Sequence, residues 1–484
     1  MPVLNDLQPK EVLHYFEALS AIPHGSGNTK AISDYCVRFA EARGLACRQD
    51  EYNNVVIVKE ASQGYENAPT VILQGHLDMV CEKTADCALD MKTEGLQLRT
   101  DGQWLWAEDT TLGGDDGIAV AMALALLDDD ALCHPRLEVV LTVDEEIGML
   151  GAEAMQTDDL QGRLLLNVDS EEEGILTVSC AGGVTAKCHV PVEREMTEGV
   201  LCELEIKSLI GGHSGVEIHK GRANANVLMG RLLYGLYQEM ALRLVELSGG
   251  TADNAIAPTC CAKVLVAREE LPRVEGIAAS YSYAFSKEYQ TADPKVHVEF
   301  RPGEPAELPA VTLSATARVI SAMMLLPNGV QAMSMDIHGL VQTSLNLGIL
   351  RLGECEATAT FSVRSSVATE KTMLCNRLDC LASLLGGEVS YTGDYPAWEY
   401  HHESKFRDLV SHVYEKQAGK KPVIQAIHAG LECGIFSGKL PGLDCVSIGP
   451  DMEAIHTPRE RLNLASTERT WKLICEILRR AKEL

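Results

Sequence analysis

Two kinds of apolar segment alternate along the first 170 residues of the chain. Buried strands are predicted for four short, β-branched or leucine-rich runs, at 55–58, 70–73, 137–143 and 164–168. Residues 7–20 and 28–42 carry apolar positions at helical spacing, and residues 118–127 are apolar on nearly all sides, which predicts a buried helix. Strands that alternate with helices predict an α/β fold with a mostly parallel, doubly wound sheet.

The pattern changes near residue 187 and returns after Pro396. Between these points we expect α+β structure, with strands at 201–208, 262–267, 296–300 and 357–362 and helices at 223–247, 274–289, 310–325 and 369–385. The α/β pattern then resumes, with predicted elements at 404–418 (helix), 444–448 (strand) and 466–482 (helix). We therefore predict a discontinuous first domain, residues 1–186 and 396–484, and an inserted domain, residues 187–395.

Histidine and acidic residues gather where the predicted strands end. These residues are His76 and Asp78, the Asp115-Asp116 pair in a glycine-rich turn, Asp144-Glu145-Glu146, and Asp169. In an open α/β sheet such strand ends meet at one edge. Adjacent carboxylates repel one another, so they must be solvated or neutralised by a cation. Gly75 is expected to end the regular pattern of the strand before His76.

Each feature also has a simpler explanation when it is taken alone. A histidine two residues from an aspartate is more often structural than a metal ligand. One aspartate at the turn could be only a helix cap, although the second then needs another reason. Together, imidazole and carboxylate ligands without a thiolate pattern suit zinc, manganese or cobalt.

Composition narrows the class of protein. The chain has 484 residues, 46% of them hydrophobic, and a net charge of −27, which argues against nucleic acid and anionic membranes as partners. Its 16 cysteines form no Cys-x-x-Cys pair, so free buried thiols in a reducing cytoplasm are expected rather than a zinc ribbon or disulfides. The N-terminal residues show no signal peptide, and the apolar run at 117–127 is too short to span a bilayer.

Five motifs, in this order along the chain, resemble the metal-site motifs of the M20 metallopeptidases. They are His76-x-Asp78, Gly114-Asp115-Asp116-Gly117, Asp144-Glu145-Glu146-x-Gly148, Asp169 and Ile455-His456-Thr457-Pro458. The large inserted domain and the stretch 428–434 resemble the bacterial aminoacyl-histidine (Xaa-His, β-alanyl-histidine) dipeptidase branch. The resemblance implies a zinc-peptidase-like catalytic domain with an inserted α+β lid and dimerisation domain.

The resemblance also implies a role for each motif. Two divalent ions are expected, with zinc as the first choice and cobalt or manganese as alternatives. Asp115 would bridge them, His76 and Asp169 would bind one, and Glu146 and His456 the other; the residues alone leave open which of Asp115 and Asp116 bridges. Asp78 would hold the His76 ring. A water bridging the ions would be the nucleophile, and Glu145 its general base.

Three residues of the inserted domain are the candidates for the substrate side. By resemblance, His213 donates a hydrogen bond to the scissile carbonyl oxygen, and Arg364 clamps the free carboxylate of the substrate. Asn254 would contact the same end as Arg364. The alternatives are a histidine in a surface turn and an arginine in an ordinary surface ion pair. The resemblance also implies, from an Asp rather than a Glu at position 169, a peptidase that takes a free amino terminus.

Together these points predict a cytoplasmic, homodimeric, two-metal dipeptidase that hydrolyses Xaa-His and other unblocked dipeptides. A related aminoacylase or carboxypeptidase is the alternative enzyme. A metal-binding scaffold without activity would be expected to have lost Glu145 or a ligand. The inserted domain is about twice the size of the lid in simple members of the M20 family. His213 could therefore act within its own chain rather than across a dimer interface.

Overall fold

The computed structural model describes residues 3–484, so the first two residues of the predicted first domain lie outside the described part. The chain forms two compact units. Unit 1 consists of Met1–Cys180, Tyr400–Ala426 and Leu431–Leu484, and unit 2 of Ala181–Glu399 and Ile427–Gly430. The chain thus enters unit 2 at Ala181 and leaves it after Glu399, whereas the predicted boundaries fall after residues 186 and 395.

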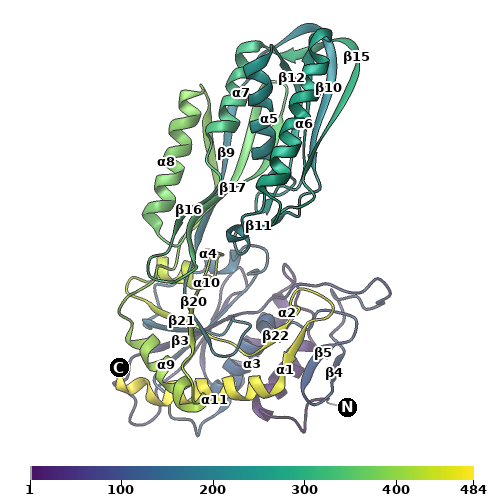
Figure 1. Ribbon diagram of the computed structural model, residues 1–484. Coiled ribbons are helices and arrows are strands. Elements are labelled where there is room, and N and C mark those ends of the chain that lie inside the picture. The colour runs from purple at the N-terminus through teal and green to yellow at the C-terminus, as the bar shows by residue number, and fades with distance from the viewer. Residues whose placement is uncertain (1–2) are drawn as a thin grey trace. The chain divides into compact units, whose positions relative to one another are not determined.

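Unit 1 is built around an eight-stranded sheet with the order β1-β2-β6-β3-β7-β21-β8-β20 (Figure 1). The central strands β6, β3, β7 and β21 are parallel neighbours, and antiparallel strands flank them. This mixed architecture confirms the α/β class. The strands are β1 Ala46–Gln49, β2 Val55–Lys59, β3 Val71–His76, β6 Leu137–Thr142, β7 Leu164–Asn167, β8 Ile175–Cys180, β20 Val423–Ile427 and β21 Asp444–Ser447.

Helices pack on this sheet and on one another. Helix α3 lies against β3 and is buried along nearly its whole length, as its all-round apolar sequence predicts, and α1 packs on α3. The helices of unit 1 are α1 Lys10–Ser20, α2 Lys30–Ala42, α3 Gly114–Asp128, α4 Leu150–Ala154, α9 Lys405–Ala418, α10 Glu432–Lys439 and α11 Leu464–Arg480, with the 3₁₀ helix η3 Ala481–Glu483. Within residues 3–484, no helix combines the length and apolarity needed to cross a membrane.

A second, small sheet in unit 1 joins two segments that are far apart in the sequence. Its order is β22-β23-β5-β4. Strand β23 near the C-terminus pairs with β5, which precedes α3. The pairing holds the loop around His456 beside the turn that leads into α3. The strands are β4 Leu98–Thr100, β5 Trp104–Ala107, β22 Met452–Glu453 and β23 Arg461–Asn463.

Unit 2 contains a large antiparallel sheet with helices α5, α6, α7 and α8 along one face, and a small two-stranded sheet of β11 and β13 (Figure 1). The sheet order is β15-β10-β14-β12-β17-β18-β9-β19, with β16 paired to β17. Buried and more exposed positions alternate along β9, β10 and β14, because one face of the sheet meets the helices. The main strands are β9 Gly182–Pro191, β10 Arg194–Lys207, β12 Arg243–Gly249, β14 Cys260–Val266, β15 His297–Val311, β16 Gly329–Met333, β17 Val341–Leu352, β18 Glu356–Ser365 and β19 Glu388–Tyr395. The helices are α5 Ala225–Glu239, α6 Leu271–Glu288, α7 Leu313–Leu325 and α8 Ala368–Leu384; the short elements are β11 Gly212–His213, β13 Ala255–Ile256, η1 Ile218–Lys220 and η2 Arg268–Glu270.

The long helix predicted over residues 223–247 is wrong in its last third. Helix α5 ends at Glu239, and residues 243–249 form β12, which pairs with β14 and β17. Neither glycine nor proline marks the break. Leu244 and Leu247 fit helical spacing equally well, and a bulge between Leu244 and Glu246 disturbs the alternation of a strand. Sheet pairing, a contact distant in sequence, therefore decides the structure here.

Gly75 does not end the strand, because β3 continues to His76. A Cβ atom at this position would lie 2.5 Å from Asp116 Oδ2 and 2.8 Å from the Cβ atom of Ala119. A glycine here therefore lets the start of α3 approach β3 closely, and that approach brings Asp116 to the strand end.

We predict that Gly75→Ala destabilises unit 1 by about 1–3 kcal/mol, the usual cost of overpacking a close contact. Urea unfolding followed by tryptophan fluorescence measures the change. The matched control is Gly276→Ala in α6, where an added Cβ meets nothing within 4 Å. In a helix that change should stabilise by up to about 1 kcal/mol. A Gly75→Ala variant as stable as the parent would contradict the close approach.

Candidate metal centre

The candidate ligands in unit 1 come from neighbouring strands and from α3. His76 is the last residue of β3, Asp169 lies two residues beyond β7, and Glu145 and Glu146 follow β6. Because β6, β3 and β7 are adjacent and parallel, their carboxyl ends share one edge of the sheet. Asp115 reaches the same edge from the turn into α3.

Asp115 lies between two imidazole rings. Its Oδ1 atom is 3.1 Å from His76 Nε2, and its Oδ2 atom is 3.1 Å from His456 Nε2. The same nitrogen of His456 is 2.9 Å from Glu146 Oε1. One carboxylate thus reaches two histidines through different oxygens, which is the arrangement that a carboxylate shared by two cations requires.

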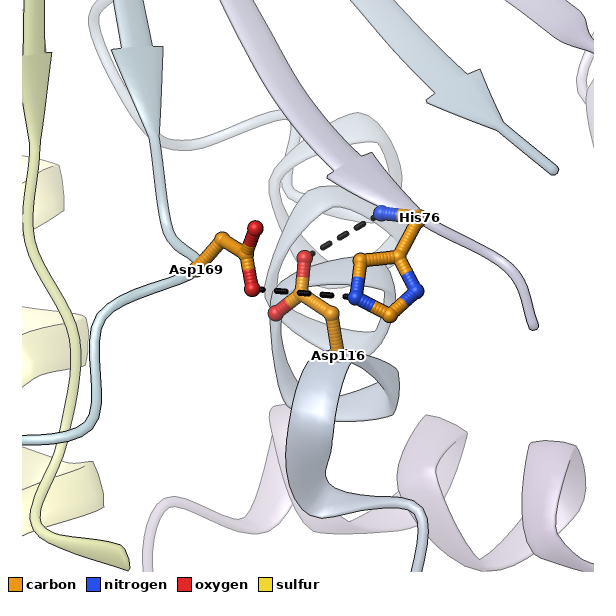
Figure 2. Close-up of side chains that lie close together, drawn as sticks. All are labelled: His76, Asp116 and Asp169. Atoms are coloured by element: carbon orange, nitrogen blue, oxygen red, sulfur yellow. Dashed lines mark hydrogen bonds and ion pairs between the residues drawn. The ribbon is translucent and has the colours of Figure 1, made fainter. Parts of the chain in front are cut away.

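Asp116 and Asp169 lie close together beside His76 (Figure 2). The Oδ2 atom of Asp116 accepts a hydrogen bond from the His76 backbone N–H at 3.1 Å, and Asp169 Oδ1 is 3.7 Å from His76 Nε2. The other oxygen of Asp116 is buried and has no hydrogen-bond partner within residues 3–484. Neither Asp115 nor Asp116 caps α3 through its side chain. Helix capping, the simpler explanation for the pair, therefore fails.

Three groups of side chains are compact enough to hold a cation, with their ligand atoms within 4.8 Å of one another. They are His76–Asp116–Asp169, His76–Glu145–Glu146 and Asp115–Glu146–His456. All donors in these groups are imidazole nitrogens or carboxylate oxygens, and the 16 cysteines are free thiols elsewhere. Zinc, cobalt and manganese accept this donor set, so the residues fit a divalent metal.

Asp78 ties His76 to the turn after β6. The Nδ1 atom of His76 is 2.9 Å from the backbone carbonyl oxygen of Asp78 and 3.5 Å from its carboxylate. The carboxylate also accepts hydrogen bonds from the backbone N–H groups of Glu145 (3.0 Å) and Glu146 (3.3 Å) and from the Ser26 hydroxyl (2.8 Å). Asp78 therefore orients the ring of one candidate ligand and the backbone that carries another.

A buried chain of polar side chains runs under the centre and was missed from the sequence. Gln74 donates to Glu432 and accepts from Asn167 at 2.7 Å, and the Thr142 hydroxyl donates to Glu432 at 2.7 Å. Asn167 Oδ1 in turn accepts the Asp169 backbone N–H at 3.3 Å. The sequence signal that could have revealed this chain is a polar residue in each of three mainly apolar strands: Gln74 in β3, Thr142 in β6 and Asn167 in β7.

The electrostatics show how much negative charge is crowded here. Burial lowers the pKa of His76, but hydrogen bonds with Asp115, Asp169 and Asp78 outweigh it, and the pKa lies well above its usual value. Hydrogen bonds with Asp115 and Glu146 raise the pKa of His456 to about 10. Burial raises the pKa of Glu145 to about 9 and that of Asp169 to about 6. Protons thus offset the charge that divalent cations would neutralise.

The three predicted substrate residues all lie in unit 2. His213, in β11, accepts backbone N–H groups of Gly215 and Val216 at Nδ1, at 3.1 and 3.2 Å. That pattern puts the proton of the neutral ring on Nε2, which can then donate. Asn254 is exposed, and its backbone carbonyl accepts the Ser214 N–H at 2.8 Å.

Arg364, in β18, is only 9% exposed. Its Nη1 donates to the Tyr395 hydroxyl at 3.0 Å, its Nε lacks a hydrogen-bond partner, and no carboxylate of residues 3–484 forms an ion pair with it. The ordinary surface ion pair is therefore not what the structure holds.

His428 belongs to the same part of unit 2; the sequence analysis names the stretch 428–434 but gives this histidine no role. Its Nε2 atom is 2.7 Å from the Ser344 hydroxyl, and its buried Nδ1 has no partner within the described chain. Burial lowers the pKa of His428 to about 3, with Arg364 and His213 adding to the effect. The ring is therefore neutral at physiological pH.

Comparison with known proteins identifies the family. The model of peptidase family M20/M25/M40 matches residues 72–480. The chain belongs to this family. The resemblance inferred from the five motifs is thus confirmed, and this M20 peptidase is a hydrolase of peptide bonds from a metal-dependent family.

Individual relatives cover the whole length of this M20 peptidase. It is 36% identical over 483 residues to the cytosol non-specific dipeptidase of Escherichia coli (strain K12), with 99% of each chain covered. Its fold matches the crystal structure of aminoacylhistidine dipeptidase from Vibrio alginolyticus with a TM-score of 0.92, at 35% identity over 98% of this chain and 97% of that one. The crystal structure of an aminopeptidase from Bacillus cereus ATCC 10987 matches with a TM-score of 0.56 and 14% identity, over 98% of this chain and 99% of that one. At this identity the match shows a similar fold and no more.

Proposed function

We propose that this M20 peptidase is a metal-dependent dipeptidase that hydrolyses Xaa-His and other unblocked dipeptides in the cytoplasm. The carrying observation is Asp115, whose two oxygens each lie 3.1 Å from a different histidine. The similarity to the Escherichia coli and Vibrio alginolyticus dipeptidases supports the choice of substrate. We also propose that two copies of the chain form a homodimer.

Two divalent ions, zinc by first choice and cobalt or manganese otherwise, would be held by the ends of the central strands. His76 and Asp169 would bind one ion and Glu146 and His456 the other, with Asp115 shared. When bound, the ions supply Lewis-acid activation of a water molecule and of the scissile carbonyl. Asp78 keeps the His76 ring in its ligand orientation through the contacts described above.

Glu145 would be the general base. It precedes a ligand, Glu146, by one residue, and Asp78 fixes the backbone N–H groups of both. Its carboxylate would take the proton of the attacking water and return it to the leaving amine. Burial raises the pKa of Glu145 to about 9, and bound cations would lower it, so that the carboxylate is available as a base.

We assign residues 1–186 and 396–484 to the catalytic domain and 187–395 to the lid and dimerisation domain. Arg364 would bind the substrate carboxylate, because it is a buried guanidinium without a carboxylate partner among residues 3–484. His213 would donate from Nε2 to the carbonyl oxygen as charge develops there. Asn254 would contact the carboxylate end of the substrate.

Removal of metal should abolish hydrolysis of a dipeptide such as β-alanyl-histidine, and zinc, cobalt or manganese should restore it. Elemental analysis of the chelated and reloaded protein accompanies each assay. The N-acetylated amino acid is the comparison substrate, since an aminoacylase would prefer it. Full activity in protein shown to be metal-free would overturn the proposal.

Glu145→Ala should retain its metal content and lose about a thousandfold in kcat, within the range for a lost acid–base group. Glu153→Ala, which removes an exposed acid of α4, is the matched control and should keep full activity. If Glu145→Ala loses metal but keeps its rate per bound metal, Glu145 is a ligand instead.

Arg364→Ala should remove most of the preference for a free carboxylate. The parent should strongly favour a dipeptide over its C-terminal amide, and the variant should lose about 2–4 kcal/mol of transition-state binding for the free acid only. Values of kcat/KM for both substrates measure this. The control is Arg377→Ala on the exposed side of α8. Undiminished discrimination by Arg364→Ala would assign the carboxylate to another group.

A further inference from the structure

Glu460 forms an unusual contact with the turn that carries Asp115. The residue is 3% exposed and belongs to the loop that connects β22 to β23. Its carboxylate accepts hydrogen bonds from four consecutive backbone N–H groups, those of Leu112 (2.8 Å), Gly113 (3.2 Å), Gly114 (2.8 Å) and Asp115 (3.5 Å). Successive N–H groups that converge in this way form a site for an anion, and here the anion is a side chain of the same chain.

The glycines of the turn fit this contact. Gly113 has φ = 66°, in the left-handed region that glycine adopts without strain. A Cβ atom on Gly114 would lie 3.2 Å from Glu460 Oε1, tighter than an ordinary contact. The glycine-rich sequence before Asp115 is therefore accounted for by the carboxylate that it surrounds.

The contact also determines what the two aspartates can do. Because Glu460 occupies the N–H groups of the turn, the side chains of Asp115 and Asp116 are not needed there. Asp115 faces His76 and His456, and Asp116 accepts the His76 backbone N–H.

The same loop carries His456. The Glu460 N–H donates to the Thr457 carbonyl at 3.0 Å, and Arg461, the next residue, opens β23, which pairs with β5 ahead of the turn. One short loop therefore supplies both the imidazole that meets the Asp115 carboxylate and the carboxylate that fixes the Asp115 backbone.

We propose that Glu460 is a positioning residue that holds Asp115 between His76 and His456, so that the Asp115 carboxylate is free to bridge two metal ions. The proposal rests on the two-metal function above. Glu460 itself is not a ligand, because both of its oxygens are engaged by backbone N–H groups. Its effect is on the affinity for the second cation as well as the first, since the bridging carboxylate serves both.

The test is Glu460→Gln, whose amide nitrogen would face N–H donors and cannot accept from them. Zinc titration of the metal-free protein by calorimetry should show an affinity lowered by about 10- to 100-fold, the usual effect of removing a group that orients a ligand. In the cobalt-loaded protein, the visible absorption should change, because the coordination at Asp115 changes. At saturating metal, kcat should fall while KM stays near the parent value.

Glu138→Gln is the matched control. Glu138 is fully buried in the same unit and accepts the backbone N–H groups of Gln161 and Gly162, but at the start of β6, the end away from the metal edge. Both variants should lower the unfolding temperature of the metal-free protein. Only Glu460→Gln should weaken metal binding and reduce the rise in unfolding temperature that zinc produces.

Each outcome decides the proposal. Metal affinity and cobalt spectrum equal to the parent in Glu460→Gln would make Glu460 a structural cap only and overturn the inference. If Glu460→Gln does not fold, Glu460→Asp keeps the charge one methylene shorter and should bind zinc with intermediate affinity; parent-like affinity there would overturn it. A parent protein that binds no divalent metal would instead refute the proposed function, before any variant is compared.

Discussion

Repulsion among carboxylates is the constraint on which unit 1 depends. The carboxylates of Asp115, Asp116, Glu145, Glu146 and Asp169 meet at the carboxyl ends of the central parallel strands, and within residues 3–484 the cations in direct contact with them are His76 and His456. Burial makes the charged forms more costly, which is why the pKa of Glu145 rises to about 9 and that of Asp169 to about 6. A site of this kind is stable when cations or protons occupy it, and the surrounding backbone must keep the acids from separating.

Strand β3 shows how the fold meets that constraint. Gly75 admits α3, Gln74 links Asn167 and Glu432, and His76 is held at the end of the strand by Asp78. Three consecutive residues thus serve packing, the buried polar chain and the candidate ligand set. Substitutions in this strand would therefore be felt in both stability and metal affinity, and the two effects must be measured separately.

The sequence predicted best where apolar runs are continuous and sites lie at their ends. The central strands of unit 1 and the residues at their ends follow from periodicity, because a buried parallel strand leaves few polar positions. Prediction from the sequence failed where pairing between distant strands determines the secondary structure. The example is β12, where the predicted helix past Glu239 is wrong. The sequence also did not show which of Asp115 and Asp116 would bridge the ions. The reason is the same, because the contact that orients their turn comes from Glu460, near the other end of the chain.

Unit 2 presents the opposite electrostatic problem. Arg364 is buried and donates to the Tyr395 hydroxyl, but its Nε has no hydrogen-bond partner within residues 3–484. Its neighbours are a neutral His428 and a His213 whose pKa is lowered by burial and by Arg364. A buried cation without a carboxylate partner is costly, so an anion from outside the chain would stabilise this arrangement. Neutral imidazoles add hydrogen-bonding capacity without adding charge that would repel Arg364. Under the proposed function, the free carboxylate of an unblocked dipeptide would be that anion, and an N-terminal blocking group would leave this contact unchanged. Discrimination against acylated substrates, which the proposed function requires, would therefore have to come from the amine end.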